Sequence, residues 1–307
     1  MATVLLGGSS GFIGSFLTRA LERDGHRVVP LARGKRDTDT VRWDAEAGTI
    51  DTDALARLQP DIVINLAGEE LAQRWTAARR RRIRDSRVNG TTALASALAI
   101  LPVKPRVLVN ASAMGYYGAH RGDELLDETT GPAGDFLSSV TQAWEHATHP
   151  ASDAGIRVVM PRTSLVLGED GGVLARLLLP FRLGIGGRLG DGHQWMSWIS
   201  MDDWVRALQF CIATPALVGP VNFVSPEPVT NREFTATIAR MLRRPAVFPV
   251  PAFVLELIFG EMANQTILAS QRLVPKRLAG AGFEFRHPRL EQALRAVLTR
   301  SGGPTDR

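Results

Sequence analysis

Three glycines near the N-terminus, set between two apolar patterns, constrain the fold of this chain more than any other feature. The stretch TVLLGGSSGFIG, residues 3–14, starts with the branched and apolar residues of a buried strand. Gly8, Gly11 and Gly14 follow, and the next apolar residues repeat at the spacing of a helix with one buried face. The pattern predicts a strand, a tight turn and a helix that begins at the turn.

Each glycine has its own physical role in a loop of this kind. Gly8 permits the sharp turn, Gly11 lets the backbone approach a pyrophosphate, and Gly14 lets the helix pack closely on the strand. The backbone N–H groups at the start of the helix then face the phosphates. The alternative is an ordinary glycine-rich turn, but the strand before it and the helix after it favour a dinucleotide site.

Strand-like runs alternate with helical patterns along the first half of the chain. Because these runs are almost continuously apolar, we expect strands that are covered on both faces, as in a parallel sheet. The predicted fold class is α/β, a Rossmann-type doubly wound parallel sheet with a smaller, mainly C-terminal substrate domain. The runs are TVLLG, HRVVPLAR, DIVINLAG, RVLVNASA and IRVVMPRTSLVLG.

The pattern changes at about Gly168 to a stretch rich in glycine and aromatic residues. We expect residues 1–168 to form the dinucleotide-binding domain, completed by about 203–225, and residues 169–202 and 226–307 to form the substrate-facing domain. Within the changed stretch, ISMDDWVRALQFCIA predicts a helix with Asp202 or Asp203 near its start. We expect the segment GDGHQWMSW either to line a substrate pocket or to form the hydrophobic contact between the two regions. Its candidate residues are His193, Gln194, Trp195 and Trp198.

Composition limits the setting and the partners of the chain. No run of 18 apolar residues is free of charge in the 307 residues, so we expect no membrane span and no membrane partner. The N-terminus lacks the basic region of a secretory signal, and Cys211, the single cysteine, has no partner for an internal disulfide. We therefore expect a cytoplasmic protein.

Most of the net charge of +5 comes from an arginine-rich run, residues 74–87. The run contains a single aromatic residue, Trp75, and no recognised nucleic-acid-binding motif, so it predicts a solvated helix face, and nucleic-acid binding is the weaker alternative. The six histidines are scattered and no cysteine cluster exists, so we expect no metal site.

The end of the second predicted strand indicates which dinucleotide binds. NAD sites generally carry an acidic residue there to meet the adenosine ribose. This chain instead reads PLARGKR, with Arg33, Lys35 and Arg36. These cations suit the additional 2′-phosphate of NADP(H), which we predict as the cofactor.

Four segments in order, GGSSGFIG, NLAG, SAMGYYG and PRTSLVLG, resemble the extended short-chain dehydrogenase/reductase superfamily, of the NAD-dependent epimerase/dehydratase type. Three longer segments resemble its atypical epimerase-family branch, whose C-terminal domain has no assigned function. They are NLAGEELAQRW, LLPFRLGIGGRLGDGHQWMSWI and ASQRLVPKRLAGAGFEFRHPRLEQAL. The resemblance covers essentially the whole chain, and it implies a cofactor across the C-terminal edge of the sheet.

The resemblance also implies which residues bind that cofactor. Arg33 would hold the 2′-phosphate, Arg87 would reach a phosphate, and the backbone of Val166 would meet the nicotinamide. The alternatives are core packing for Leu66 and Val166 and a solvated charge for Arg87. The pyrophosphate would lie against Gly8, Ser10, Gly11, Phe12 and Ile13, and the adenosine ribose would border Leu66, Ala67 and Gly68.

The chain departs from the superfamily at the usual proton donor. Members that move hydride use a Tyr and, four residues later, a Lys on one helix face. The helix expected in DFLSSVTQAWEHA carries Phe136 and Val140 at those places. Ser112 remains where the superfamily binds the substrate oxygen, with Tyr116 or Tyr117 as the partner that would move a proton or merely pack in the loop.

The sequence thus supports two hypotheses. The first is an NADP(H)-binding oxidoreductase or epimerase-like enzyme acting on an unknown small molecule, with Ser112, Tyr116 and Tyr117 as candidate catalytic residues. The second is a non-catalytic NADP(H) sensor that regulates a partner, as the missing Tyr and Lys suggest. A homodimer is expected only by analogy with related proteins.

Overall fold

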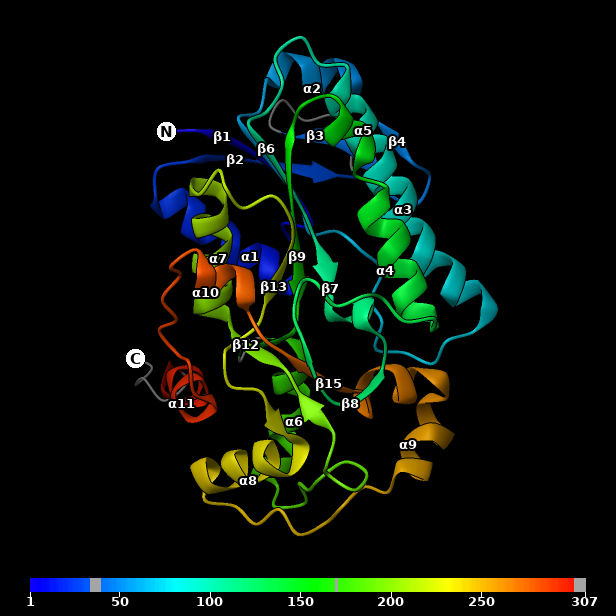
Figure 1. The fold of residues 1–307 in the computed structure, drawn as a ribbon, viewed down its shortest axis with the longest axis vertical. Helices are drawn as coiled ribbons and strands as arrows, with labels where there is room; N and C mark the ends of the chain where they lie inside the picture. The colour runs from blue at the N-terminus through cyan, green and yellow to red at the C-terminus, as the bar shows by residue number, and fades with distance from the viewer. Residues whose placement is uncertain (34–39, 169–170, 301–307) are drawn as a thin grey trace, which may run out of the picture. The chain divides into compact units, whose positions relative to one another are not determined.

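The computed structural model describes residues 1–33, 40–168 and 171–300 (Figure 1). The chain forms two compact units that interleave along the sequence. The first unit comprises Met1–Tyr116, Phe136–Arg162 and Leu208–Val221, and the second comprises Tyr117–Asp135, Thr163–Ala207 and Asn222–Arg307. Tyr117–Asp135 therefore belongs to the second unit, although it precedes residue 168. The domain bounds expected from the sequence stay a prediction.

A large, mainly parallel sheet confirms the predicted α/β class. Its strand order is β13-β9-β6-β5-β1-β2-β3-β4, and β7 pairs with β9. From β1 the chain moves outward to β2 and β3 and then returns to β5 on the other side, so the order reverses at β1. The strands are β1 (Thr3–Gly7), β2 (Arg27–Ala32), β3 (Val41–Asp44), β4 (Thr49–Ile50), β5 (Ile62–Asn65), β6 (Val107–Asn110), β7 (Ser112–Ala113), β9 (Arg157–Thr163) and β13 (Gly219–Phe223).

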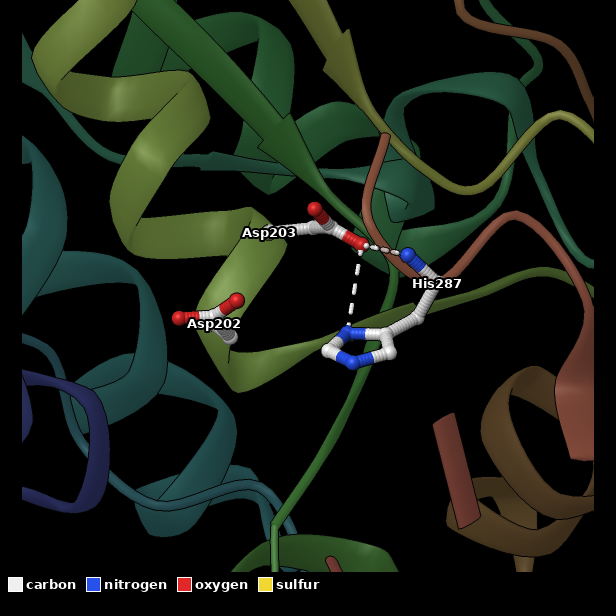
Figure 2. Close-up of side chains that lie close together, drawn as sticks. All are labelled: Asp202, Asp203 and His287. Atoms are coloured by element: carbon white, nitrogen blue, oxygen red, sulfur yellow. Dashed lines mark hydrogen bonds and ion pairs between the residues drawn. The ribbon is translucent and has the colours of Figure 1, made fainter. Parts of the chain in front are cut away.

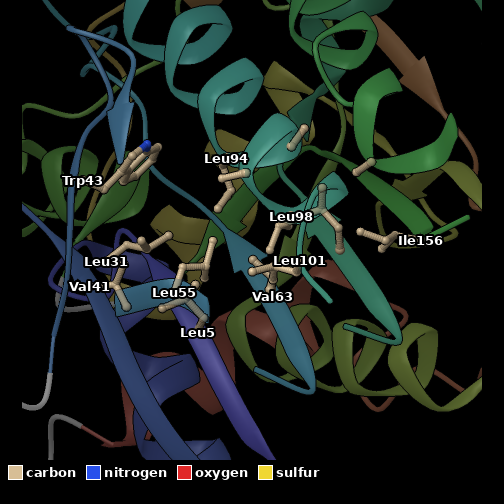
Figure 3. Packing of buried hydrophobic residues seen from close by; sticks show 14 of the residues in the cluster. Leu5, Leu31, Val41, Trp43, Leu55, Val63, Leu94, Leu98, Leu101 and Ile156 are labelled. Carbon is tan, nitrogen blue, oxygen red and sulfur yellow. The ribbon is translucent and has the colours of Figure 1, made fainter. Parts of the chain in front are cut away.

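Buried aliphatic residues join this sheet to its helices in the first unit. Leu5 on β1 and Val63 on β5 pack in one cluster with Leu94 and Leu98 of α3 (Figure 3). The ring nitrogen of Trp144 on α4 donates to the hydroxyl of Thr91, which ties α4 to α3. The helices of this unit are α1 (Phe12–Arg23), α2 (Thr52–Leu58), α3 (Ala77–Ala99), α4 (Phe136–His146) and α5 (His149–Asp153), and α7 (Met201–Ala213) ends in it.

The second unit has its own core, in which Trp198 and Phe234 pack with Leu174 and Leu294. Its strands are short and pair two by two, β10 with β12, β11 with β14 and β15 with β8. These elements are β8 (His120–Leu126), β10 (Leu165–Leu167), α6 (Gly172–Arg182), β11 (Trp195–Met196), β12 (Trp198–Ser200), β14 (Val229–Thr230), α8 (Asn231–Leu242), α9 (Ala252–Phe259), β15 (Ser270–Leu273), α10 (Lys276–Gly280) and α11 (Leu290–Arg300). A 3-10 turn, Met114–Tyr117, and a π-helical turn, Ala263–Ile267, complete the list.

Across the described ranges, no helix combines the length and the apolar character that crossing a bilayer demands.

One ion pair fixes the start of α10 to the end of β8. Its electrostatics predict how the stability of the fold depends on pH. The ammonium of Lys276 donates to Asp127 at 2.6 Å, and Thr129 also donates to this carboxylate. These hydrogen bonds, that of Lys276 first, lower the pKa of Asp127 to about 2. Because the folded pKa is below the unfolded one, the pair stabilises the fold above about pH 4 and this stabilisation is lost as the pH falls towards about 2.

At pH values above about 4, we predict that Lys276→Met lowers the midpoint of urea unfolding by a small amount, because the pair is solvent-exposed. The difference from the wild type should shrink as the pH falls towards about 2. Lys104→Met is the matched control, because Lys104 donates to a backbone carbonyl, that of Ala154. A Lys276→Met difference that stays constant over this pH range would contradict the prediction.

Candidate functional site

The turn after β1 brings the backbone of Gly8 against the end of β5. Gly8 has a φ of +79°, and a Cβ there would lie 2.9 Å from the carbonyl carbon of Leu66. A Cβ on Gly14 would lie 2.0 Å from the carbonyl oxygen of Gly8, so α1 packs directly on the turn. Neither position has room for a side chain, and the turn keeps its shape only with glycine at both.

The first turn of α1 is open to an anion. Ser10 and Gly11 are exposed, and Gly11 caps the helix without a side-chain hydrogen bond. No acidic residue lies in this turn. The first N–H groups of a helix have no partner inside it and carry a partial positive charge. Phe12 and Ile13 supply two of these groups, so the residues present fit the phosphates of a dinucleotide.

Three neighbouring parallel strands carry most of the predicted cofactor residues at one edge of the sheet. β1 pairs with β2 on one side and with β5 on the other. Arg33 follows β2 and is exposed, the glycine turn follows β1, and Leu66–Gly68 follows β5. Lys35 and Arg36 lie outside the described residues. The strand order reverses here, which is where open α/β sheets bind ligands.

Arg87 on α3 is a half-buried cation beside this edge. A Cβ on Gly68 would lie 3.1 Å from its Cζ, and its guanidinium donates to the carbonyl oxygens of Ile83 and Glu69 at 3.0 and 3.1 Å. The group also lies 5.1 Å from the ring centre of Trp144. Burial lowers the pKa of Arg87 to about 10, partly opposed by the Glu69 carboxylate. Arg87 is charged at neutral pH but is not a solvated surface charge.

Ser112 belongs to a buried polar cluster that the sequence did not reveal. Its hydroxyl donates to Oε1 of Glu145 at 2.6 Å. Arg162 pairs with both oxygens of this carboxylate, Nε with Oε1 at 2.8 Å and Nη2 with Oε2 at 2.9 Å. Arg162 is 3% exposed and Ser112 is equally buried. The cluster joins β7, α4 and β9. The serine hydroxyl donates to a fixed carboxylate, and its oxygen keeps the lone pairs with which it can accept a hydrogen bond.

Of the two candidate tyrosines, Tyr116 lies at this cluster. The Cζ of Arg162 lies 3.4 Å from the centre of the Tyr116 ring, which is partly exposed. Tyr117 is fully buried in the second unit, and its hydroxyl donates to the amide oxygen of Asn222 at 2.7 Å. Asn222 in turn donates to the carbonyl oxygens of two other chain segments. Tyr117 is thus packed inside the second unit, whereas Tyr116 contacts Arg162 of the Ser112 cluster.

The expected helix with Phe136 and Val140 is α4, and both residues pack. The ring of Phe136 meets that of Trp75 edge to face at 5.2 Å between centres, and the guanidinium of Arg80 lies 4.3 Å from it. Val140 is 3% exposed. Val166 lies on β10 in the second unit and is buried, so its contact with a nicotinamide stays a prediction.

Glu145 and Arg162 are the members of the cluster that the sequence analysis missed. The signal was Arg162 within RVVMPRT, because a charge that follows four apolar residues of a buried strand needs a buried partner. The identity of that partner is not readable from the sequence, since Glu145 lies 17 residues away on a helix.

Within the described part of the chain, Asp202, Asp203 and His287 form the group of donors close enough to hold a metal ion (Figure 2). Asp203 is, however, engaged by the protein. Its oxygens accept from Ser200, from Arg206 and from the backbone N–H groups of residues 286 and 287. Ser200 caps the start of α7, because its hydroxyl oxygen accepts from the N–H of Asp203, and the Asp203 carboxylate fastens the C-terminal segment to this helix.

The aromatic stretch of the second unit serves two purposes. Trp198 is fully buried in the core of this unit. His193 and Gln194 line an open hollow of about 590 Å³, and Trp195 donates to Asp123, which lines it as well.

Comparison with known proteins adds the family context. Residues 4–224 match the model of the NAD dependent epimerase/dehydratase family, and residues 250–297 match a domain of unknown function, DUF1731. An epimerase family protein of Mycobacterium bovis is 44% identical over 98% of this chain and 99% of its own length. These matches cover both the sheet region and the C-terminal region.

Solved structures agree with the fold. The human epimerase family protein SDR39U1, isoform 2, solved with NADPH, is 32% identical over 97% of this chain and 99% of its own, with a TM-score of 0.87. The UDP-glucose 4-epimerase of Thermus thermophilus, solved with NAD, is 21% identical over 98% of this chain and 99% of its own, with a TM-score of 0.76. At that identity the second likeness concerns the fold alone.

The Glu145–Arg162 pair makes a prediction about stability. Glu145→Leu leaves Arg162 buried without its carboxylate, and we expect a loss of about 3–5 kcal/mol of unfolding free energy in urea. The double variant Glu145→Leu/Arg162→Met should recover most of this loss, because it removes both charges. Glu291→Leu, which breaks an exposed pair with Arg295, is the control and should cost less than about 1 kcal/mol. Equal losses for Glu145→Leu and Glu291→Leu would contradict the prediction.

Proposed function

Because this chain belongs to the NAD dependent epimerase/dehydratase family, which confirms the resemblance found in its sequence, we propose that it binds NADP(H) and transforms a small molecule. The observation that carries the proposal is the glycine turn at the strand-order reversal, where Gly8 approaches the end of β5 and α1 begins without a capping side chain. The proposed reaction is an oxidation, a reduction or an epimerisation at a carbon that bears oxygen.

Arg33 is the proposed reason for preferring NADP(H) over NAD(H). It follows β2 directly, is exposed, and occupies the place where NAD sites carry an acidic residue. A guanidinium binds a phosphate through paired, charge-assisted hydrogen bonds. The NADPH in the structure of the human relative SDR39U1 supports this preference.

Arg87 is proposed to bind an anionic or hydroxyl group of the cofactor next to Gly68. Its guanidinium donates hydrogen bonds to two neutral carbonyl oxygens, those of Ile83 and Glu69. The lowered pKa means that burial costs free energy that these contacts do not offset. An anion at this edge of the sheet would offset that cost, which is why we assign Arg87 to the cofactor.

Ser112 is proposed to hold the substrate oxygen, and Glu145 to receive its proton. The bound nicotinamide supplies or accepts the hydride. In the oxidation direction, a substrate hydroxyl passes its proton to the oxygen of Ser112, while Ser112 passes its own proton to Glu145. Arg162 holds the carboxylate in line with the serine through two hydrogen bonds. Tyr116, stacked on Arg162, is proposed to contact the same substrate oxygen.

A second candidate function is an NADP(H) sensor without turnover. It is favoured by one observation, the packed apolar side chains of Phe136 and Val140 where the superfamily carries its Tyr and Lys. In that case the protein would bind the cofactor tightly and consume none.

The cofactor assignment predicts a selective effect of Arg33→Ala. We expect the affinity for NADPH, measured by calorimetry, to fall about 10- to 100-fold, as for the loss of charge-assisted hydrogen bonds worth about 1.5–3 kcal/mol. The affinity for NADH should change less than about twofold, since NADH lacks the 2′-phosphate. Arg81→Ala removes another exposed arginine and serves as the control. Equal losses for both nucleotides would count against NADP(H).

The proton path predicts which residues turnover needs. Wild-type protein with NADPH and a panel of aldehydes, ketones and nucleotide sugars should consume the cofactor. Ser112→Ala should lower kcat about 100-fold or more with an unchanged affinity for NADPH, because the serine contacts the substrate oxygen. Ser139→Ala, an exposed serine on α4, is the control. Tight NADPH binding without turnover on the whole panel would favour the sensor.

A further inference from the structure

Two neighbouring loops of the second unit form an exposed surface that is both apolar and cationic. The first loop, residues 183–190, follows α6, and the second, residues 243–250, joins α8 to α9. The N–H of Val250 donates to the carbonyl oxygen of Arg188 at 2.9 Å, and that of Gly190 donates to Val250 at 2.8 Å. We call residues 183–190 and 243–250 the loop pair.

The apolar side chains of the loop pair stand out from the protein. Leu183, Ile185, Val247 and Phe248 are between 57 and 69% exposed. Among the described residues, most of the large apolar side chains with such exposure lie on the loop pair or on the helices beside it. Those on the helices are Leu179 of α6 and Phe253 and Leu257 of α9. Exposed apolar side chains gathered in this way mark a contact surface.

The charges of the loop pair all have one sign. Arg188, Arg243 and Arg244 are exposed, and among the described residues none of the three has an ion-pair partner. The sequence contains no Asp or Glu in residues 171–190 or 234–255. By contrast, the exposed Arg295 of the same unit is paired with Glu291. The loop pair itself therefore contains no acidic residue, and the exposed acids next to it in the sequence are Asp191 and Glu256.

We propose that the loop pair binds the surface of a membrane that contains anionic lipids. Leucine, isoleucine and phenylalanine side chains enter the boundary between headgroups and acyl chains, while arginines bind the lipid phosphates. Charge complementarity selects this occupant, because a symmetric contact with a second copy would place arginines against arginines. Insertion into a headgroup layer also needs no groove, whereas a folded partner must match the shape of the projecting side chains.

This contact differs from the membrane partner that the sequence analysis excluded. That exclusion rested on the lack of a long apolar segment able to span the bilayer. The loop pair lies on the membrane and does not cross it, and its residues become neighbours only through the fold. Leu183 and Phe248 are 65 residues apart in the sequence.

The test is sedimentation of the full chain with vesicles. We expect binding to phosphatidylcholine vesicles with about one third phosphatidylglycerol, weak binding to pure phosphatidylcholine, and release by added salt. Arg243→Gln/Arg244→Gln should weaken the apparent affinity about 25-fold, from a roughly fivefold effect for each charge near an anionic surface. Leu183→Ser/Phe248→Ser should also weaken binding, because the apolar anchors are lost.

Matched control variants distinguish binding by the loop pair from general effects of net charge and of exposed apolar surface. Arg81→Gln/Arg82→Gln removes two exposed arginines of α3, and Ile100→Ser/Val103→Ser removes two exposed apolar residues of the first unit. Both controls should bind vesicles as the wild type does, and circular dichroism should show all variants folded. No binding to the anionic vesicles, or equal losses in the controls, would overturn the proposal. Self-association that Leu183→Ser/Phe248→Ser abolishes would instead assign the surface to a second copy, and binding to an acidic peptide but not to vesicles would assign it to a protein.

Discussion

The arrangement of the first unit depends on backbone packing against backbone at the end of β1. Gly8 lies against the start of the segment after β5, and Gly14 of α1 lies against the carbonyl of Gly8. This contact fixes the distance of the helix from the sheet, and it directs the first turn of α1 towards the edge where β2 and β5 also end. A single side chain at either glycine would move the helix and separate these groups. The anion-binding character of the edge is thus a consequence of packing and of the helix terminus together.

Two arginines, Arg162 buried and Arg87 half-buried, illustrate how the unit treats charge. Arg162 has a complete partner, because Glu145 meets its guanidinium with both oxygens. Arg87 has carbonyl oxygens and an aromatic ring, and burial lowers its pKa to about 10. A buried charge with neutral partners costs free energy, whereas a paired one is largely compensated. Arg162 thus joins the elements around Ser112, whereas Arg87 carries a charge whose hydrogen-bond partners are neutral, in keeping with its proposed contact with the cofactor.

The sequence predicted what local patterns determine. The glycine turn, the helix after it, the parallel sheet and the helix α4 follow from periodicity and from residues that suit one conformation. The helix α7 was expected with an acid near its start, and Asp203 has that position. The Ser112 cluster was beyond reach, because β7, α4 and β9 meet only in the folded unit. The arginine-rich run was expected to be solvated, yet Arg87 within it is half-buried and donates to backbone carbonyl oxygens, since a helix of 23 residues turns one face inward.

Phe136 and Val140, which the sequence is expected to place where the superfamily carries its Tyr and Lys, belong to a packed face of α4. Phe136 packs on Trp75 and beside Arg80, so its ring is held at the end of α4 by apolar and cation–π contacts. Val140, one turn further, is almost fully buried. A lysine there would have to bury an ammonium, which costs several kcal/mol without a partner. The face that carries proton chemistry in the superfamily has therefore become structural, whereas Glu145, two turns on, pairs with Ser112. If this chain transfers a proton, the acid–base residue is Glu145, which lies further along the same helix and not on another element.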